Sequence, residues 1–110
     1  MPKKRTDIYL ADIIMACKRI EEYVEGFDRN KFDKDTRTQD AVIRQLAIIG
    51  EASKKVPKPT KSKNPNIDWR AAAGMRDVLI HDYPNVIVKV VWETATKDVP
   101  KLLEDIKKLI

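Results

Sequence analysis

The amino-acid sequence predicts an all-α fold, an up-and-down bundle of four main helices followed by a short C-terminal helix. Three observations favour this fold. Apolar residues recur every three or four positions along most of the chain, which is the spacing of a helix that buries one face. One segment alone favours a strand, and no other segment offers it a partner. The 110 residues fit a single domain, residues 1–110, with enough chain for one core.

The first helix is expected from Asp7 to Val24. Its apolar residues are spaced by four, three and four positions and share one face: Ile13, Cys17, Ile20 and Val24. Because Cys17 lies on this face, we expect a buried thiol. Gly26 should end the helix. The charged segment from Phe27 to Asp33 then carries two aromatic residues, Phe27 and Phe32, which should pack under the turn.

Asp35 or Thr36 should cap a second helix that runs to about Lys55. Its apolar face combines five residues: Val42, Ile43, Leu46, Ala47 and Ile49. Gly50 costs about 1 kcal/mol relative to alanine inside a helix, so it should serve close packing against another helix. Arg44 and Glu51, seven positions apart, share another side. That side is either a solvated, ion-paired surface or the border of a catalytic cleft.

The segment from Pro57 to Asn66 is expected to be a loop, because its prolines do not fit a helix interior. Basic residues surround the prolines with no acidic residue between them: Lys54, Lys55, Lys58, Lys61 and Lys63. This segment is either a solvated linker or an electrostatic guide for an RNA backbone or an acidic protein.

Asp68 should cap the third helix, which begins at Trp69. Pro84 disfavours helical dihedrals at Tyr83, so this helix should end near His81 or Asp82. The small residues at positions 71–74 suit a close helix crossing or an interface between two chains. Arg76 falls on the apolar face of this helix, where a guanidinium is costly unless it finds a carboxylate, carbonyls or a phosphate.

His81, the only histidine, lies five residues after Arg76 and about 140° around an ideal helix from it. The two side chains would converge only at a frayed helix end or between two copies of the chain. Asp77, four residues before His81, could orient the imidazole. Arginine, histidine and a carboxylate are sufficient to cleave RNA, in which the 2′-hydroxyl is the nucleophile. The same residues could instead form ion pairs that only stabilise the helix end.

The segment from Val86 to Trp92 has strand propensity, but its apolar residues do not alternate. We therefore predict a helix from Val86 to about Asp98, with Trp92 in the core or in a dimer interface. Pro100 should then start a separate last helix, from Lys101 to Leu109.

Charge and composition restrict the partners. The formal net charge of +5 suits a polyanion, and no stretch approaches the roughly 20 apolar residues that span a bilayer. Asp7 and Asp12 interrupt any signal-peptide pattern, which favours a cytoplasmic protein. One cysteine and one histidine do not make a zinc site, and no carboxylate cluster suits magnesium. We therefore expect neither a metal nor another cofactor.

Arg76, His81 and Tyr83 form the pattern R-x4-H-x-Y, and an apolar run ending at Trp92 follows them. The segment from Asp40 to Ala52, which ends in Gly-Glu-Ala, and the chain length are further points of similarity. Together these features resemble the HepT-like toxins of the HEPN class, which pair with a minimal nucleotidyltransferase. The resemblance covers most of the chain.

The resemblance implies the toxin ribonuclease of a type II toxin–antitoxin system. Arg76 and His81 would cleave RNA without a metal ion at the cleft of a homodimer, with Asp77 orienting the imidazole. Tyr83 would receive AMP groups from the cognate nucleotidyltransferase antitoxin, which would neutralise the toxin. The alternative is a non-catalytic subunit that presents substrate to a nucleotidyltransferase.

Overall fold

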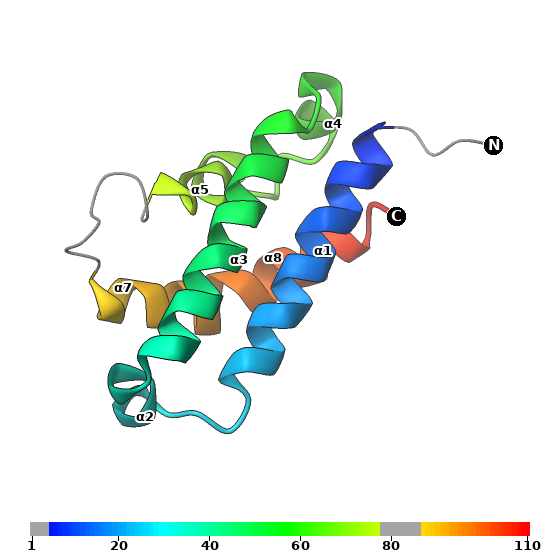
Figure 1. Cartoon of the computed structure of the whole chain (residues 1–110). Helices are drawn as coiled ribbons and strands as arrows, with labels where there is room; N and C mark the ends of the chain where they lie inside the picture. Colours follow the sequence, from blue (N-terminus) through cyan, green and yellow to red (C-terminus); the bar gives the residue numbers. More distant parts are fainter. Residues whose placement is uncertain (1–4, 78–86) are drawn as a thin grey trace.

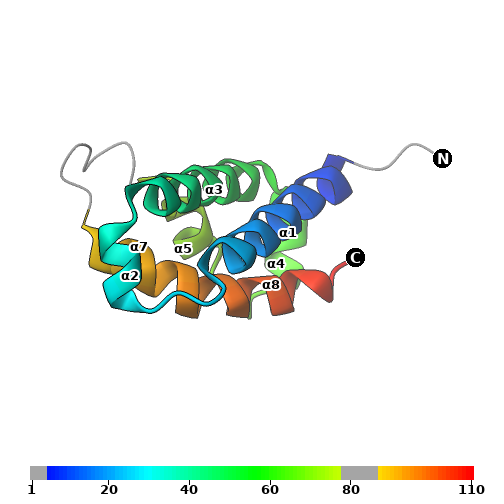
Figure 2. The ribbon, with the colours of Figure 1, turned by 60° about the horizontal axis from the view of Figure 1, so that its bottom comes forward.

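The computed structural model describes residues 5–77 and 87–110, and within these ranges the chain is helical and contains no strand. Two long helices, α1 (Arg5–Val24) and α3 (Thr36–Lys55), lie side by side (Figure 1). The C-terminal helical segment crosses beneath both of them (Figure 2). The predicted all-α bundle is confirmed, with differences in its shorter elements.

The core lies where α1, α3 and the C-terminal helices meet. It contains most of the apolar face predicted for α1, including Cys17, and Val42, Leu46 and Ile49 of the face predicted for α3, whereas Ile43 and Ala47 are only half-buried. Large apolar side chains that are fully buried are Leu10, Ile13, Cys17, Ile20, Phe32, Val42, Leu46, Ile49, Val91, Val99 and Ile106. Burial of Cys17, followed by the nearby Glu21 carboxylate, raises the pKa of this thiol to about 12. The thiol is therefore protonated at neutral pH, as expected for a core residue.

Asp35, the first of the two cap candidates, caps α3. Its carboxylate accepts a hydrogen bond of 2.9 Å from the Thr38 backbone N–H. This hydrogen bond lowers the pKa of the Asp35 carboxyl.

The segment between α1 and α3 is more regular than expected. A short helix, α2 (Arg29–Lys34), begins at Asp28, whose carboxylate accepts a hydrogen bond from the Lys31 backbone N–H. Phe32 is fully buried, and its ring centroid lies 5.0 Å from that of Trp92. The predicted packing of Phe32 under the turn and of Trp92 against the core is therefore confirmed.

The prediction of a loop from Pro57 to Asn66 is wrong, because this segment contains α4 (Lys58–Lys63). Pro59 lies in the first turn of α4, where a backbone N–H has no acceptor within the helix, so a proline is tolerated. The Asn64 side chain donates a hydrogen bond of 2.8 Å to the Thr60 carbonyl near the other end of α4.

The third predicted helix is shorter than expected. Asp68 caps α5 (Trp69–Gly74) by accepting from the Ala71 N–H at 2.9 Å, as predicted. The regular helix ends at Gly74, and the Met75 N–H bonds to the Ala72 carbonyl three residues back, a spacing typical of helix ends. The angle of about 140° between the Arg76 and His81 side chains holds only if one regular helix runs from Arg76 to His81. The course of the chain from Val78 onward lies outside the described residues until Ile87.

The segment with strand propensity is helical, as predicted, but it begins at Val88. α7 (Val88–Glu93) continues through a π-helical turn, η1 (Thr94–Asp98), directly into α8 (Val99–Lys107). The predicted last helix is therefore present as α8, with Pro100 in its first turn, but no break separates it from η1. In the wider π turn the Val99 N–H reaches back to the Thr94 carbonyl, and the chain accommodates Pro100 without breaking.

Candidate functional site

The candidate site is built around the contact between α3 and the end of α5. A Cβ atom at Gly50 would lie 2.5 Å from the Arg76 Cβ and 2.6 Å from the Arg76 backbone nitrogen. It would also lie 2.9 Å from the Ala73 carbonyl oxygen. Only glycine allows this approach, as predicted for Gly50. The crossing places the Arg76 backbone directly against α3.

The carboxylate that Arg76 needs comes from α3. The Arg76 Nε lies 2.7 Å from the Glu51 Oε1, and the two side chains remain 35% and 46% exposed. Such an exposed pair contributes only about 0–1 kcal/mol, so its main effect is to orient the guanidinium. Within residues 5–77 and 87–110, Glu51 is the carboxylate that pairs with Arg76, and the Arg76 side chain stays partly exposed.

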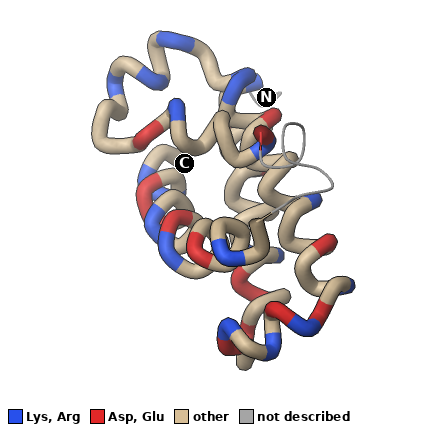
Figure 3. The backbone as a smooth tube through the Cα atoms, turned by 90° about the vertical axis from the view of Figure 1, so that its left-hand side faces the viewer, with Lys and Arg blue, Asp and Glu red and all other residues tan. Residues whose placement is uncertain are grey.

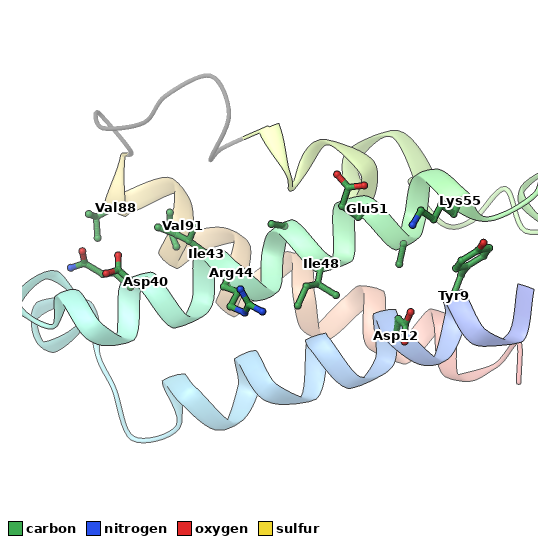
Figure 4. A pocket seen from close by; sticks show the side chains of 13 residues that line it. Tyr9, Asp12, Asp40, Ile43, Arg44, Ile48, Glu51, Lys55, Val88 and Val91 are labelled. Carbon is green, nitrogen blue, oxygen red and sulfur yellow. The ribbon is translucent and has the colours of Figure 1, made fainter. Parts of the chain in front are cut away.

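Glu51 also lines an open groove of about 790 Å³ that follows one side of α3 between α1 and α7 (Figure 4). Ile43, Ala47 and Ile48 supply apolar surface, and the charged side chains of Asp40, Arg44 and Lys55 come from the same helix. Tyr9 and Asp12 line the groove from α1. Arg44 and Glu51 thus share one side of α3, as the sequence indicated, and that side borders a groove.

The other predicted site residues fall in different places. Asp77 is exposed and follows Arg76 directly, at the end of the described segment. His81 and Tyr83 lie outside the described residues. The structure therefore places Arg76 in contact with Glu51, which lines the groove, whereas the convergence of Arg76 with His81 stays a prediction.

The five predicted RNA-binding lysines occupy one end of the molecule, from the last turn of α3 through α4 (Figure 3). Four are exposed, and Lys61 is half-buried. Lys55 connects this cluster to the groove, where its ammonium lies 5.9 Å from the centre of the Tyr9 ring. The cluster is thus continuous with the groove that Glu51 borders.

Sequence reasoning missed part of this site. Tyr9 and Asp12 were assigned no function, because nothing in their local pattern shows which side of α1 faces α3. Asp40 had a usable signal. Asp40, Arg44, Glu51 and Lys55 recur at intervals of four, seven and four residues, a helical spacing that places all four charges on one side.

The described residues offer neither a metal site nor a membrane-spanning helix. No three histidine, cysteine, aspartate or glutamate side chains there are grouped so that they could hold a metal ion. No helix in the described part of the chain is both long and apolar enough to cross a membrane.

Comparison with known proteins identifies the family. Residues 13–109 match the family model described as ribonuclease HepT-like. A protein of Thermococcus cleftensis named a probable ribonuclease HepT is 48% identical, over 92% of this chain and 92% of its own length. Provisionally named RNases of Caldanaerobacter subterraneus and Methanocaldococcus jannaschii are each 39% identical. Those matches cover 93% and 100% of this chain, and 91% and 95% of the relatives.

No solved structure matches the chain. The family match covers most of the sequence, and the relatives align over nearly their full length. The resemblance inferred from the R-x4-H-x-Y pattern and its flanks is therefore confirmed at the level of the family. The chain belongs to the HepT-like ribonuclease family.

Proposed function

We propose that this protein is the toxin ribonuclease of a type II toxin–antitoxin pair and that it cleaves RNA in the cytoplasm without a metal ion. Arg76 and His81 form its catalytic pair at a cleft between two copies of the chain. Family membership and the names of the relatives support ribonuclease activity. The toxin role, the dimer and the residue assignments go beyond those matches.

The observation that carries the proposal is the position of Arg76. Contact with Gly50 holds its backbone, and Glu51 holds its Nε, so the guanidinium is oriented beside the groove. The Nη groups can then bind two oxygens of one phosphate, a geometry that arginine provides and lysine does not.

The proposed reaction uses the 2′-hydroxyl of the RNA as an internal nucleophile. His81 takes the proton of this hydroxyl or protonates the leaving 5′-oxygen, because a histidine side chain can act as either base or acid near neutral pH. Arg76 stabilises the negative charge that grows on the phosphate oxygens. Asp77 orients the imidazole, and the lysines of α3 and α4 attract the RNA backbone.

A purified His81→Ala variant tests the catalytic assignment. We expect it to lose RNA cleavage and growth inhibition while its melting temperature stays close to that of the wild type. Both proteins are assayed with EDTA present, so that cleavage by the wild type also tests independence from divalent metals. Unaltered cleavage by the variant would remove His81 from the mechanism. If the wild type binds RNA without cleaving it, the protein is instead the substrate-presenting subunit of a nucleotidyltransferase.

Tyr83 is the proposed acceptor of AMP from the cognate minimal nucleotidyltransferase. AMP groups carry negative phosphates, which would occupy the phosphate site of Arg76 and repel RNA. After co-expression with the nucleotidyltransferase, intact-mass spectrometry should show added AMP on the wild type and none on Tyr83→Phe. Added AMP on Tyr83→Phe would place the acceptor at another residue. Tyr9→Phe is the matched control, because Tyr9 lines the groove and lies outside the motif.

A further inference from the structure

Glu51 has a cationic neighbour on its own helix. Lys55 lies four residues further along α3, the spacing at which a glutamate and a following lysine form an ion pair on a helix surface. The structure pairs Glu51 with Arg76 instead, through the contact of 2.7 Å between Oε1 and Nε. The Lys55 ammonium lies over the Tyr9 ring of α1. The Glu51 carboxylate is therefore directed at the proposed catalytic arginine rather than at the partner that local spacing favours.

Arg76 is held at both ends of its side chain. Its Cβ and its backbone nitrogen lie against Gly50 of α3, so closely that a Cβ on residue 50 would clash with both. Its guanidinium is held by the Glu51 carboxylate. An unrestrained arginine samples many rotamers, and the loss of this freedom opposes the binding of a phosphate. The two contacts with α3 therefore orient the guanidinium before RNA binds.

The charge of Glu51 has a second, opposite effect on the same site. The carboxylate contacts Nε, whereas the proposed function assigns the Nη groups of Arg76 to the scissile phosphate, so both anions adjoin one guanidinium. Two negative groups beside one cation repel each other. This repulsion weakens the binding of the phosphate, while the orientation of Arg76 favours the reaction of a phosphate that is already bound.

From these two effects we infer that Glu51 is a positioning residue for RNA cleavage, which acts through Arg76, raises the rate of the cleavage step and lowers the affinity for RNA. The inference rests on the proposed function, in which Arg76 binds the phosphate. In the cleavage step the 2′-hydroxyl loses its proton, its oxygen bonds to phosphorus, and the 5′-oxygen leaves with a proton. Negative charge grows on the remaining phosphate oxygens, so a correctly aimed guanidinium stabilises the transition state more than the bound RNA.

Three substitutions separate the charge of Glu51 from its reach. Glu51→Gln keeps the length of the side chain and an oxygen that can accept from Nε, but it removes the charge. Glu51→Asp keeps the charge and is one methylene shorter, and Glu51→Ala removes both. We expect RNA to bind roughly threefold more tightly to Glu51→Gln and Glu51→Ala, because they lack the repelling charge. Glu51→Asp should bind RNA like the wild type.

The rate of cleavage should follow the reach of the side chain. The single-turnover rate constant should fall roughly tenfold in Glu51→Asp and Glu51→Ala, which no longer hold Nε, and less in Glu51→Gln. Fluorescence anisotropy measures affinity with a 2′-O-methyl RNA oligonucleotide, which lacks the nucleophile and is not cleaved. Cleavage is measured on the same sequence with free 2′-hydroxyl groups. Analytical ultracentrifugation establishes that each variant has the association state of the wild type.

The ion pair between Arg29 and Asp33 on α2 provides a matched control. Its distance from Nε to Oδ1 is also 2.7 Å, and its side chains are 41% and 39% exposed, close to the 35% and 46% of Arg76 and Glu51. Asp33→Asn should change the melting temperature as little as Glu51→Gln does, since both pairs are exposed. It should leave RNA affinity and the cleavage rate unchanged. A kinetic change confined to the Glu51 variants therefore reports on the site and not on overall stability.

Cleavage at the wild-type rate by Glu51→Ala would exclude a positioning role, and weaker RNA binding by Glu51→Gln would exclude the repulsion. Equal kinetic changes in Asp33→Asn would also overturn the inference. Arg76→Ala separates these results from a failure of the proposed function, because it should abolish cleavage. If Arg76→Ala cleaves like the wild type, the proposed catalytic pair is wrong. If it is inactive while Glu51→Ala is fully active, the proposed function stands and the role of Glu51 alone is refuted.

Discussion

At the scale of single residues, Gly50 determines where the catalytic candidate lies. A glycine inside α3 is costly for the helix, yet its missing Cβ allows contact with the Arg76 backbone. The ion pair between Arg76 and Glu51 is exposed and adds little stability, so the close crossing sets the position and the carboxylate sets the orientation. The position of Gly50 inside α3 predicts close packing against another helix, but the sequence does not show that Arg76 is the residue it contacts.

Substituting Gly50→Ala tests this assignment. Despite the gain of about 1 kcal/mol in helix propensity, we expect a net loss of about 1–3 kcal/mol in the free energy of unfolding, because backbone atoms must move. The measurement is urea denaturation of the wild type and the variant. Gly74→Ala is the control, since among the described residues a Cβ there meets only the Asp77 Oδ2 at 4.0 Å. Equal stability changes in both variants would show that the crossing is not constrained.

At the scale of elements, two segments differ from their sequence-based predictions because of proline. The prolines of the segment from Pro57 to Asn66 predict a loop, yet Pro59 occupies the first turn of α4, where no N–H is required. Pro100 predicts the start of a last helix, and α8 does begin there, but it continues from α7 and η1 without a break. Local rules for proline give the sites where a helix is weakened, and the surrounding packing decides whether it breaks. As a consequence, Lys58, Lys61 and Lys63 lie on the helix α4 instead of on a loop.

Replacing Lys58, Lys61 and Lys63 with glutamine tests the function of α4. If these lysines contact the RNA backbone, the triple variant should bind single-stranded RNA more weakly. Its plot of log affinity against log salt should also be shallower by about 2, since each lost phosphate contact removes roughly 0.7 from the slope. Fluorescence anisotropy over a salt series measures both quantities. A control triple variant replaces Lys97, Lys107 and Lys108, which are exposed on η1 and on the last turn of α8.

At the scale of the whole molecule, the main consequence of the fold is a charged, apolar-floored groove on a small bundle. α1, α3 and α7 together form its walls, although they lie far apart in the sequence. A single copy leaves this surface open.

Association should make the apparent stability depend on concentration. If the folded chain dimerises, as proposed, the melting temperature of the wild type should rise with protein concentration. Differential scanning fluorimetry over a hundredfold concentration range measures this effect. A wild-type melting temperature independent of concentration would argue for a folded monomer.

The sequence by itself determined the helical fold, the apolar faces of α1 and α3, the caps at Asp35 and Asp68, and the family. These features depend on contacts between residues a few positions apart, which the spacing of residue types records directly. Only the tertiary structure decided that Glu51 is the partner of Arg76, that Gly50 is their point of contact, and that α1 and α7 turn one side of α3 into a groove. Such pairings join residues distant in the chain, and they follow from the way whole helices pack, which no local pattern encodes.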